Sequence, residues 1–251
     1  MWKLQIQPQY ASHNSWEALA VQEELGYEAL ELSVPPYAGS LDGRRQWYQK
    51  SGRLNAIHGA FVDVNPGSSD PDVCALSMRR CHESCSLAKS LGVKHVIFHS
   101  SCETFLRGAY LDLWAGRCAS FYETLADLYD IQIWLENSQD IDATPLDELM
   151  KRIPDPRIGV CLDFGHIHYS RMPMEQWFEI LGERVGYLHL SDNNGLYDEH
   201  LPLGDGTVNW EAADALWKNT GKKMLLTLET GGIEGAARSV AYLKEHGLFG
   251  F

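Results

Sequence analysis

The chain of 251 residues is 45% hydrophobic and carries a formal net charge of −13 at pH 7. This apolar fraction lets a chain of such length bury a large core without disulfide bridges. The negative charge argues against a nucleic-acid partner, because an acidic surface repels phosphodiester backbones unless its loops supply a basic patch. No Pro- or Ser-rich linker divides the sequence, so we expect one domain over residues 1–251.

Cysteine usage and the N-terminal sequence predict a cytoplasmic protein. The six cysteines lack the spacing of a disulfide framework, and Cys74, Cys81 and Cys85 recur at helical intervals on one face. This pattern is typical of reduced core residues. The first residues contain no apolar segment of a signal peptide, and no run approaches about 18 apolar residues, so we expect no membrane association.

Short apolar runs alternate with longer amphipathic segments along the whole chain. The runs that we predict as strands are KLQIQ, YEALELSV, LNAIHG, VKHVIFHS, IQIWLEN, GVCLDFG, VGYLHLS and KMLLTLET. The predicted helices cover residues 16–25, about 41–50, 71–92, 111–129, 145–153, 173–182, 209–219 and 233–247. Eight strand–helix pairs favour a (β/α)8 TIM barrel of the α/β class over an open doubly wound sheet, which usually needs fewer strands.

Residues of the types that commonly bind metal ions, His, Asp and Glu, lie at the ends of six predicted strands. They are His58, His99, Glu136, Asp163, His189 and Glu229. In a barrel the carboxyl ends of all parallel strands meet at one face, where active sites are built. One such residue at a strand end is weak evidence, but six at equivalent places predict a divalent-metal site at the C-terminal face.

Neighbouring polar residues have weaker claims to a role in this site. His168 and Asp192 each lie beside a better candidate, so we expect them to support the ligands rather than bind the ion. His82 lies within a predicted helix and His95 lies early in a strand, and both are interpreted as structural. Cys161 is expected in the core.

The motifs WLEN, CLDFGHIH, YLHLSD, DEHLPLGDG and TLET carry a resemblance that spans essentially the whole chain. On these motifs the sequence resembles the xylose isomerase-like TIM-barrel superfamily. That superfamily includes sugar isomerases and epimerases of the tagatose 3-epimerase and inosose isomerase type, and also endonuclease IV. In the sugar isomerase branch the matching residues bind one divalent metal ion, and here they are Glu136, Asp163, His189 and Glu229. In the endonuclease branch, three zinc ions also use residues that match His58, His99, His166, Asp198 and His200.

Resemblance to the sugar branch implies a metal-dependent isomerase or epimerase. Two glutamates, an aspartate and a histidine suit Mn²⁺, Zn²⁺, Mg²⁺ or Co²⁺ and leave coordination positions open for substrate. If a polyhydroxy ketone binds such an ion, the adjacent C–H becomes acidic, and a glutamate can remove the proton to form an enediolate. By resemblance Glu136 and Glu229 are the acid and base as well as ligands, and His166 binds a substrate oxygen. The implied partner is a small carbohydrate.

Loop composition helps to separate sugar chemistry from DNA cleavage, which needs several cations to hold phosphates. Lys and Arg are absent from residues 60–72, 137–145, 190–209 and 230–234. Arg107 follows the fourth strand, and Arg44 and Arg45 begin the second helix. Glu199 stands where the endonuclease pattern has an arginine, and Phe61 lies near the position of a tyrosine. We therefore favour an isomerase or epimerase over an endonuclease IV-like zinc phosphodiesterase acting on abasic DNA.

Two further alternatives stay open. A dehydratase or lyase on the same scaffold needs the same metal and base, and a non-catalytic metal-binding barrel would keep the ligands without the chemistry. Trp47 and Trp114, both expected on outer helices, could mark the surface of a homo-oligomer or pack against loops.

Overall fold

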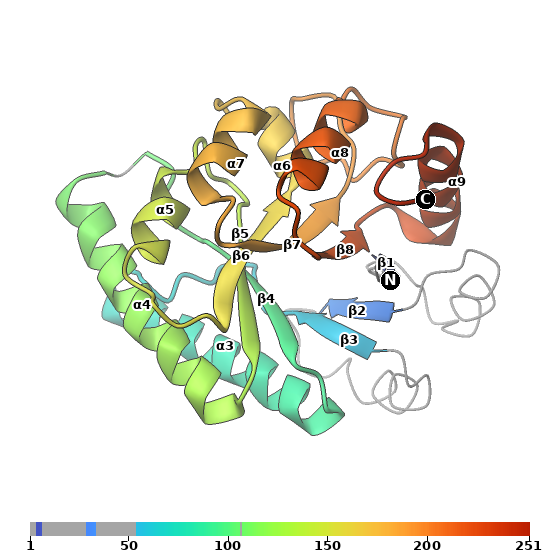
Figure 1. Ribbon diagram of the computed structural model, residues 1–251. Coiled ribbons are helices and arrows are strands. Elements are labelled where there is room, and N and C mark those ends of the chain that lie inside the picture. The colour runs from blue at the N-terminus through green and yellow to red at the C-terminus, as the bar shows by residue number, and fades with distance from the viewer. Residues whose placement is uncertain (1–3, 7–28, 34–53, 106) are drawn as a thin grey trace.

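A closed parallel barrel forms the centre of the structure, a computed structural model that describes residues 4–6, 29–33, 54–105 and 107–251 (Figure 1). Its strands follow chain order from β1 to β8, and β8 pairs with β1 to close the barrel. The strands are β1 Leu4–Ile6, β2 Ala29–Ser33, β3 Leu54–His58, β4 His95–His99, β5 Gln132–Glu136, β6 Ile158–Asp163, β7 Val185–Leu190 and β8 Leu225–Leu228. The predicted α/β TIM-barrel class is confirmed.

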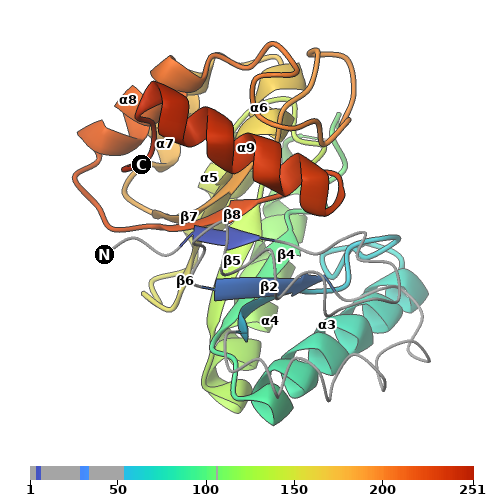
Figure 2. The same cartoon turned by 90° about the vertical axis from the view of Figure 1, so that its right-hand side faces the viewer.

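Helices pack around the outside of this barrel. The described helices are α3 Pro71–Leu91, α4 Ala109–Tyr129, α5 Thr144–Met150, α6 Phe164–Tyr169, α7 Met174–Leu181, α8 Trp210–Asn219 and α9 Gly232–His246. Figures 1 and 2 show α3 and α4 on one side of the strands and α7, α8 and α9 on the opposite side. The helices predicted at 16–25 and 41–50 lie outside the described residues. Within the described ranges, no helix has the length and apolar composition required to cross a bilayer.

The ends of α3 follow directly from its sequence. The Asp70 carboxylate accepts hydrogen bonds from the backbone N–H groups of Asp72 and Val73 at 2.8 and 3.1 Å, and so caps the helix. Pro71 occupies the first position, where its missing N–H costs nothing. Gly92 ends the helix with a φ of 72°, a left-handed conformation that glycine adopts without strain.

The structure adds a short helix, α6, that the sequence pattern does not predict. Asp163 ends β6, and its carboxylate accepts a hydrogen bond from the backbone N–H of His166 at 2.7 Å. This cap starts a helical turn immediately after the strand. A residue expected to act at the metal site therefore also fixes the backbone that carries His166.

Side chains fill the inside of the barrel and form a floor beneath the strand ends. The apolar layer contains Ala56, Ile97, Cys161 and Tyr187, with Trp134 and Leu225 packed against it. Because side chains alternate along a strand, the residue two positions further on points to the same side. The next inward layer on β3 to β7 is His58, His99, Glu136, Asp163 and His189. The expected core position of Cys161 is confirmed, and the polar strand ends lie directly above an apolar plug.

Trp114 on α4 is completely buried, which favours packing against a loop over a place on an oligomer surface. A side-chain carbon added at Gly67 would lie 2.3 Å from its indole, so the loop before α3 packs closely on this ring. Trp114 therefore gives no sign of an oligomer surface, and Trp47 lies outside the described residues. Cys81 and Cys85 are free and buried, as expected of reduced core thiols, whereas Cys74 is free but only partly buried, contrary to that expectation.

Candidate metal centre

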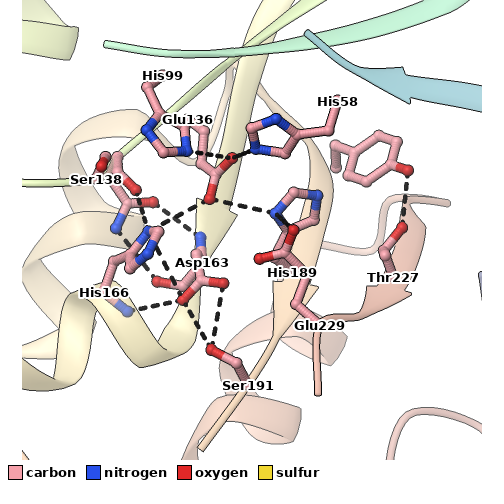
Figure 3. A network of polar contacts seen from close by, with 12 residues as sticks. His58, His99, Glu136, Ser138, Asp163, His166, His189, Ser191, Thr227 and Glu229 are labelled. Carbon is pink, nitrogen blue, oxygen red and sulfur yellow. Dashed lines mark hydrogen bonds and ion pairs between the residues drawn. The ribbon is translucent and has the colours of Figure 1, made fainter. Parts of the chain in front are cut away.

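Four side chains converge at the carboxyl ends of neighbouring strands (Figure 3). Glu136, Asp163 and His189 lie at or near the ends of β5, β6 and β7, and Glu229 directly follows β8. One ligand atom from each residue lies within 4.8 Å of the others. None of the four residues is more than 2% exposed. The structure thus brings together the residues that the sequence predicts as ligands of one ion.

Three atoms in this group have no partner in hydrogen-bonding geometry among the described residues. They are Oε1 of Glu136, Nδ1 of His189 and Oε1 of Glu229. The His189 nitrogen lies 3.2 Å from the Glu136 oxygen and 3.4 Å from the Glu229 oxygen. Buried polar atoms without partners cost free energy, whereas carboxylate oxygens and imidazole nitrogens are ligands of divalent cations. These residues therefore fit a metal ion.

Without an ion, burial disfavours the charged forms of these side chains. Burial raises the pKa of Asp163 to about 6; the charge of His166 opposes this shift, and those of Glu229 and Glu136 reinforce it. Burial also disfavours the charged form of His189, but the negative groups around it outweigh this effect and raise its pKa well above the usual range. A divalent cation would stabilise the carboxylates and displace the proton from His189.

Two histidines from β3 and β4 lie beside the other oxygen of Glu136. The Nε2 atoms of His58 and His99 lie 3.2 and 3.7 Å from Oε2 of that glutamate. Burial lowers the pKa of His99 to about 3, so its imidazole is neutral at physiological pH and free to act as a ligand or acceptor. Burial has the same tendency at His58, but the hydrogen bond to Glu136 overcomes it and raises the pKa.

A second polar group lies on α6 and on the loop after β7. The Nε2 atoms of His166 and His200 lie 3.3 and 2.9 Å from Oδ2 of Asp198. Nδ1 of His166 also lies 3.3 Å from Oε1 of Glu136, which joins this group to the first. His200 has a φ of 50°, which is uncommon for a residue with a side chain. Burial opposes its protonation, but the hydrogen bond to Asp198 and the charge of Glu229 raise its pKa to about 9. All nine predicted positions therefore form one continuous cluster.

Asp192 and His168, which we expected to support the metal ligands, lie outside this cluster. Asp192 accepts hydrogen bonds from the backbone N–H of Val208 at 3.1 Å and the indole N–H of Trp210 at 2.9 Å. Nε2 of His168 lies 2.8 Å from the Thr207 hydroxyl. Both residues brace the loop after β7, so their support of the site passes through the loop and not through direct contact with a ligand.

The two histidines interpreted as structural also lie outside the cluster. Nδ1 of His82 is 3.2 Å from the Tyr129 hydroxyl, between α3 and α4. Nδ1 of His95 accepts a hydrogen bond from the indole N–H of Trp134 at 3.1 Å, near the start of β4. Both contacts are consistent with that interpretation.

Two buried polar residues that the sequence pattern does not single out hold Asp163 and His189 in place. Asn137 donates a hydrogen bond to the carbonyl oxygen of Asp163 at 3.2 Å and accepts one from its N–H at 2.8 Å. Glu31 on β2 is fully buried, and its Oε2 lies 3.3 Å from Nε2 of His189. Asn137 was detectable only as the neighbour of Glu136, and Glu31 only as a carboxylate between two leucines of its strand.

Comparisons with known proteins agree with this architecture. A family described as xylose isomerase-like TIM barrel matches residues 19–246. The structure of a D-tagatose 3-epimerase-like protein is 24% identical, with a TM-score of 0.81 over 97% of this chain and 96% of that one. The TTHB071 protein from Thermus thermophilus, soaked with ZnCl2, is 25% identical with a TM-score of 0.78 over 97% and 96% of the two chains. An L-ribulose 3-epimerase is 17% identical with a TM-score of 0.77 over 98% and 94%.

Proposed function

Because the chain belongs to the xylose isomerase-like TIM-barrel family, we propose that it is a divalent-metal-dependent sugar isomerase or epimerase acting on a polyhydroxy ketone. The observation that carries this proposal is the pair of buried glutamates, Glu136 and Glu229, whose unpaired Oε1 atoms face the same nitrogen of His189. Fold similarity to a D-tagatose 3-epimerase-like protein and an L-ribulose 3-epimerase supports the reaction class. The residues that would hold the Mn²⁺, Zn²⁺, Mg²⁺ or Co²⁺ ion are Glu136, Asp163, His189 and Glu229.

In this proposal the two glutamates exchange protons with the substrate. When bound, the ion withdraws electron density from the substrate carbonyl and makes the adjacent C–H more acidic. Glu136 and Glu229 come from strands that are separated by β6 and β7, so they reach a substrate from different directions. One glutamate, as a carboxylate, removes the proton, and the other, as a carboxylic acid, returns a proton to the opposite face of the carbon. His166 is held at Nδ1 by the carbonyl oxygen of Asn137 at 2.6 Å, and its Nε2, which lies 3.3 Å from Oδ2 of Asp198, is the atom that would contact a substrate oxygen.

The proposal is tested by replacing Glu229 with glutamine, which keeps the side-chain shape and removes the base. In metal-loaded protein, exchange of a ketose C–H with solvent deuterium should fall by on the order of 10² or more. Substrate binding should change less than turnover. Metal content must be measured in parallel, because the substitution also removes a ligand charge.

A matched control is Glu234→Gln, which changes an exposed glutamate in the first turn of α9. Its exchange rate should equal that of the unmodified protein. Exchange that survives in metal-loaded Glu229→Gln at the unmodified rate would contradict the proposed role of Glu229.

The composition of the cluster also supports an alternative, an endonuclease IV-like zinc phosphodiesterase. Three further triads among the described residues could each hold an ion: His58, His99 and Glu136; Glu136, Cys161 and His189; and His166, Asp198 and His200. A dehydratase or lyase would use the same ligands and base. Product analysis separates the three activities, because an isomerase conserves the mass of the ketose, a dehydratase removes water, and an endonuclease incises an abasic duplex.

A further inference from the structure

A carboxylate lies inside the barrel, one layer below the candidate metal centre. Glu31 on β2 is 0% exposed, and the strand register sets it opposite Ala56 on β3. The neighbouring interior residues Ala56, Ile97, Cys161 and Tyr187 form an apolar cluster. Interior layers of such barrels are usually filled by branched aliphatic side chains, and a buried charge is costly unless it is paired. A specific interaction must therefore compensate for Glu31.

The contacts of Glu31 supply that compensation. Its Oε2 accepts hydrogen bonds from the Tyr187 hydroxyl at 2.5 Å and from the Thr227 hydroxyl at 3.0 Å. The same oxygen lies 3.3 Å from Nε2 of His189. The two hydroxyls come from β7 and β8, and they fix the carboxylate before any ion binds.

The other ring nitrogen of His189, Nδ1, points away from Glu31 and toward the candidate metal centre. Nδ1 lies 3.2 Å from Oε1 of Glu136 and 3.4 Å from Oε1 of Glu229, the two unpaired oxygens of the metal centre. An imidazole that donates Nε2–H to Glu31 keeps the lone pair of Nδ1 free for an ion. A flipped tautomer would place a proton where the ion must bind and would leave Glu31 without that donor.

We propose that Glu31 is a positioning residue, which fixes the ring orientation and tautomer of His189 and thereby raises the affinity of the centre for its ion. Partners of this kind commonly change metal affinity by about 10- to 100-fold. The inference rests on the metal centre of the proposed function, but it concerns metal binding and not the identity of the sugar. The competing explanation is that Glu31 only anchors Tyr187 and Thr227 within the core.

The test compares three variants of the full chain. Glu31→Gln keeps the volume but replaces the carboxylate; Tyr187→Phe removes one hydroxyl that holds it. Asp214→Asn is the control, since Asp214 is a buried carboxylate outside the centre, paired with Lys218 at 2.6 Å and with the backbone N–H of Phe249 at 2.7 Å. Affinity for Zn²⁺ and Co²⁺ is measured by competition with a chromophoric chelator, and unfolding of each metal-free variant is followed by circular dichroism.

Glu31→Gln should weaken binding of both ions by about 10- to 100-fold and alter the visible spectrum of bound Co²⁺. Tyr187→Phe should weaken binding in the same direction by less, and Asp214→Asn should bind as the unmodified protein does. Equal affinity of Glu31→Gln and the unmodified protein would overturn the inference, as would an equal loss in Asp214→Asn. If Glu31→Gln does not fold, Tyr187→Phe decides the question by the same measurement.

These outcomes separate the inference from the proposed function. A protein that binds metal, loses affinity in Glu31→Gln and converts no ketose would support the role of Glu31 and reject the sugar activity. If the unmodified protein epimerises a ketose and Glu31→Gln keeps its metal affinity, the sugar activity would be supported and the role of Glu31 rejected. Failure of the unmodified protein to bind Zn²⁺ or Co²⁺ would overturn both.

Discussion

The carboxylates of the cluster carry negative charges, which are balanced only by protons on the histidines or by metal ions. The pKa of His166 lies well above its usual range, because Asp163 and the hydrogen bonds to Asp198 and Glu136 outweigh burial. The pKa of Asp198 is lowered, since its hydrogen bonds to His166 and His200 overcome burial. Protonated histidines thus compensate the carboxylates in the absence of metal, and ions compete with these protons.

We predict that the cluster takes up more than one zinc ion when zinc is abundant. The additional ligands are His58, His99, His166, Asp198 and His200, and binding should release protons in proportion to the ions bound. Metal analysis after loading with excess zinc, followed by gel filtration, measures the stoichiometry. His82→Ala, which alters a histidine outside the cluster, is the control and should bind equally. A stoichiometry that never exceeds one would leave these five residues as substrate contacts.

Asp140 should make folding stability depend on pH between about 4 and 6. Burial raises its pKa to about 6, against opposing hydrogen bonds from Ser100 and Ser138. The folded state then binds a proton that the unfolded chain has already released, so stability is highest at low pH and falls as pH rises through this window. Asp140→Asn removes the titration. Its stability relative to the unmodified protein should rise by a few kcal/mol from pH 4 to pH 7.

Denaturant unfolding of both proteins across this pH range measures the difference. Subtracting the two profiles cancels the other titrating groups, which the proteins share. A difference that stays constant from pH 4 to pH 7 would contradict the raised pKa of Asp140.

At the scale of strands and helices, the packing of the Trp134 side chain of β5 against β7 depends on a glycine. A side-chain carbon added at Gly186 would lie 2.6 Å from two ring atoms of Trp134. The indole cannot retreat freely, because its N–H donates a hydrogen bond to His95. We predict that Gly186→Ala destabilises the protein by about 1–3 kcal/mol through overpacking.

Gly116 on α4 provides the matched control. An added side-chain carbon there meets nothing within 4 Å. Gly116→Ala should stabilise the helix by about 0.5–1 kcal/mol, because alanine loses less backbone entropy on folding. Denaturant midpoints of the two variants should therefore move in opposite directions. A loss of stability in Gly116→Ala equal to that in Gly186→Ala would show that the clash with Trp134 is not the cause.

Local sequence signals account for most of the elements and most of the cluster. The strand ends were predictable because apolar runs stop at His99, Glu136 and His189, and parallel strands place these residues on one face. The helix α6 was not, because it depends on how the Asp163 carboxylate is oriented at the end of β6. Glu31 contacts His189 across 158 positions of the chain, a distance that no local pattern covers. Assignment of residues 1–251 to one domain stays a prediction.

At the scale of the whole molecule, charge argues against a nucleic-acid substrate. The net charge is −13. The loops after β3, β5, β7 and β8 contain no Lys or Arg within residues 60–72, 137–145, 190–209 and 230–234, respectively. Arg107, in the loop after β4, is engaged with Asp142 at 3.1 Å and with the carbonyl oxygen of Thr104 at 2.8 Å. Arg44 and Arg45 lie outside the described residues.

We therefore predict that metal-loaded protein does not incise an abasic duplex above background, although its cluster contains the ligands for several zinc ions. Phosphate contacts by Lys and Arg supply most nonspecific affinity for DNA, and each contact adds to the salt dependence of binding. Binding to the duplex at about 50 mM salt should be weak, with a shallow salt slope.

The same preparation is assayed on a ketose panel, so that inactivity on DNA cannot be ascribed to missing metal. Glu199→Arg, which adds a cation to the loop after β7, should increase DNA binding without creating incision. Efficient incision by the unmodified protein, with no activity on any ketose, would mean that the zinc cluster outweighs the acidic surface and that the phosphodiesterase alternative is correct.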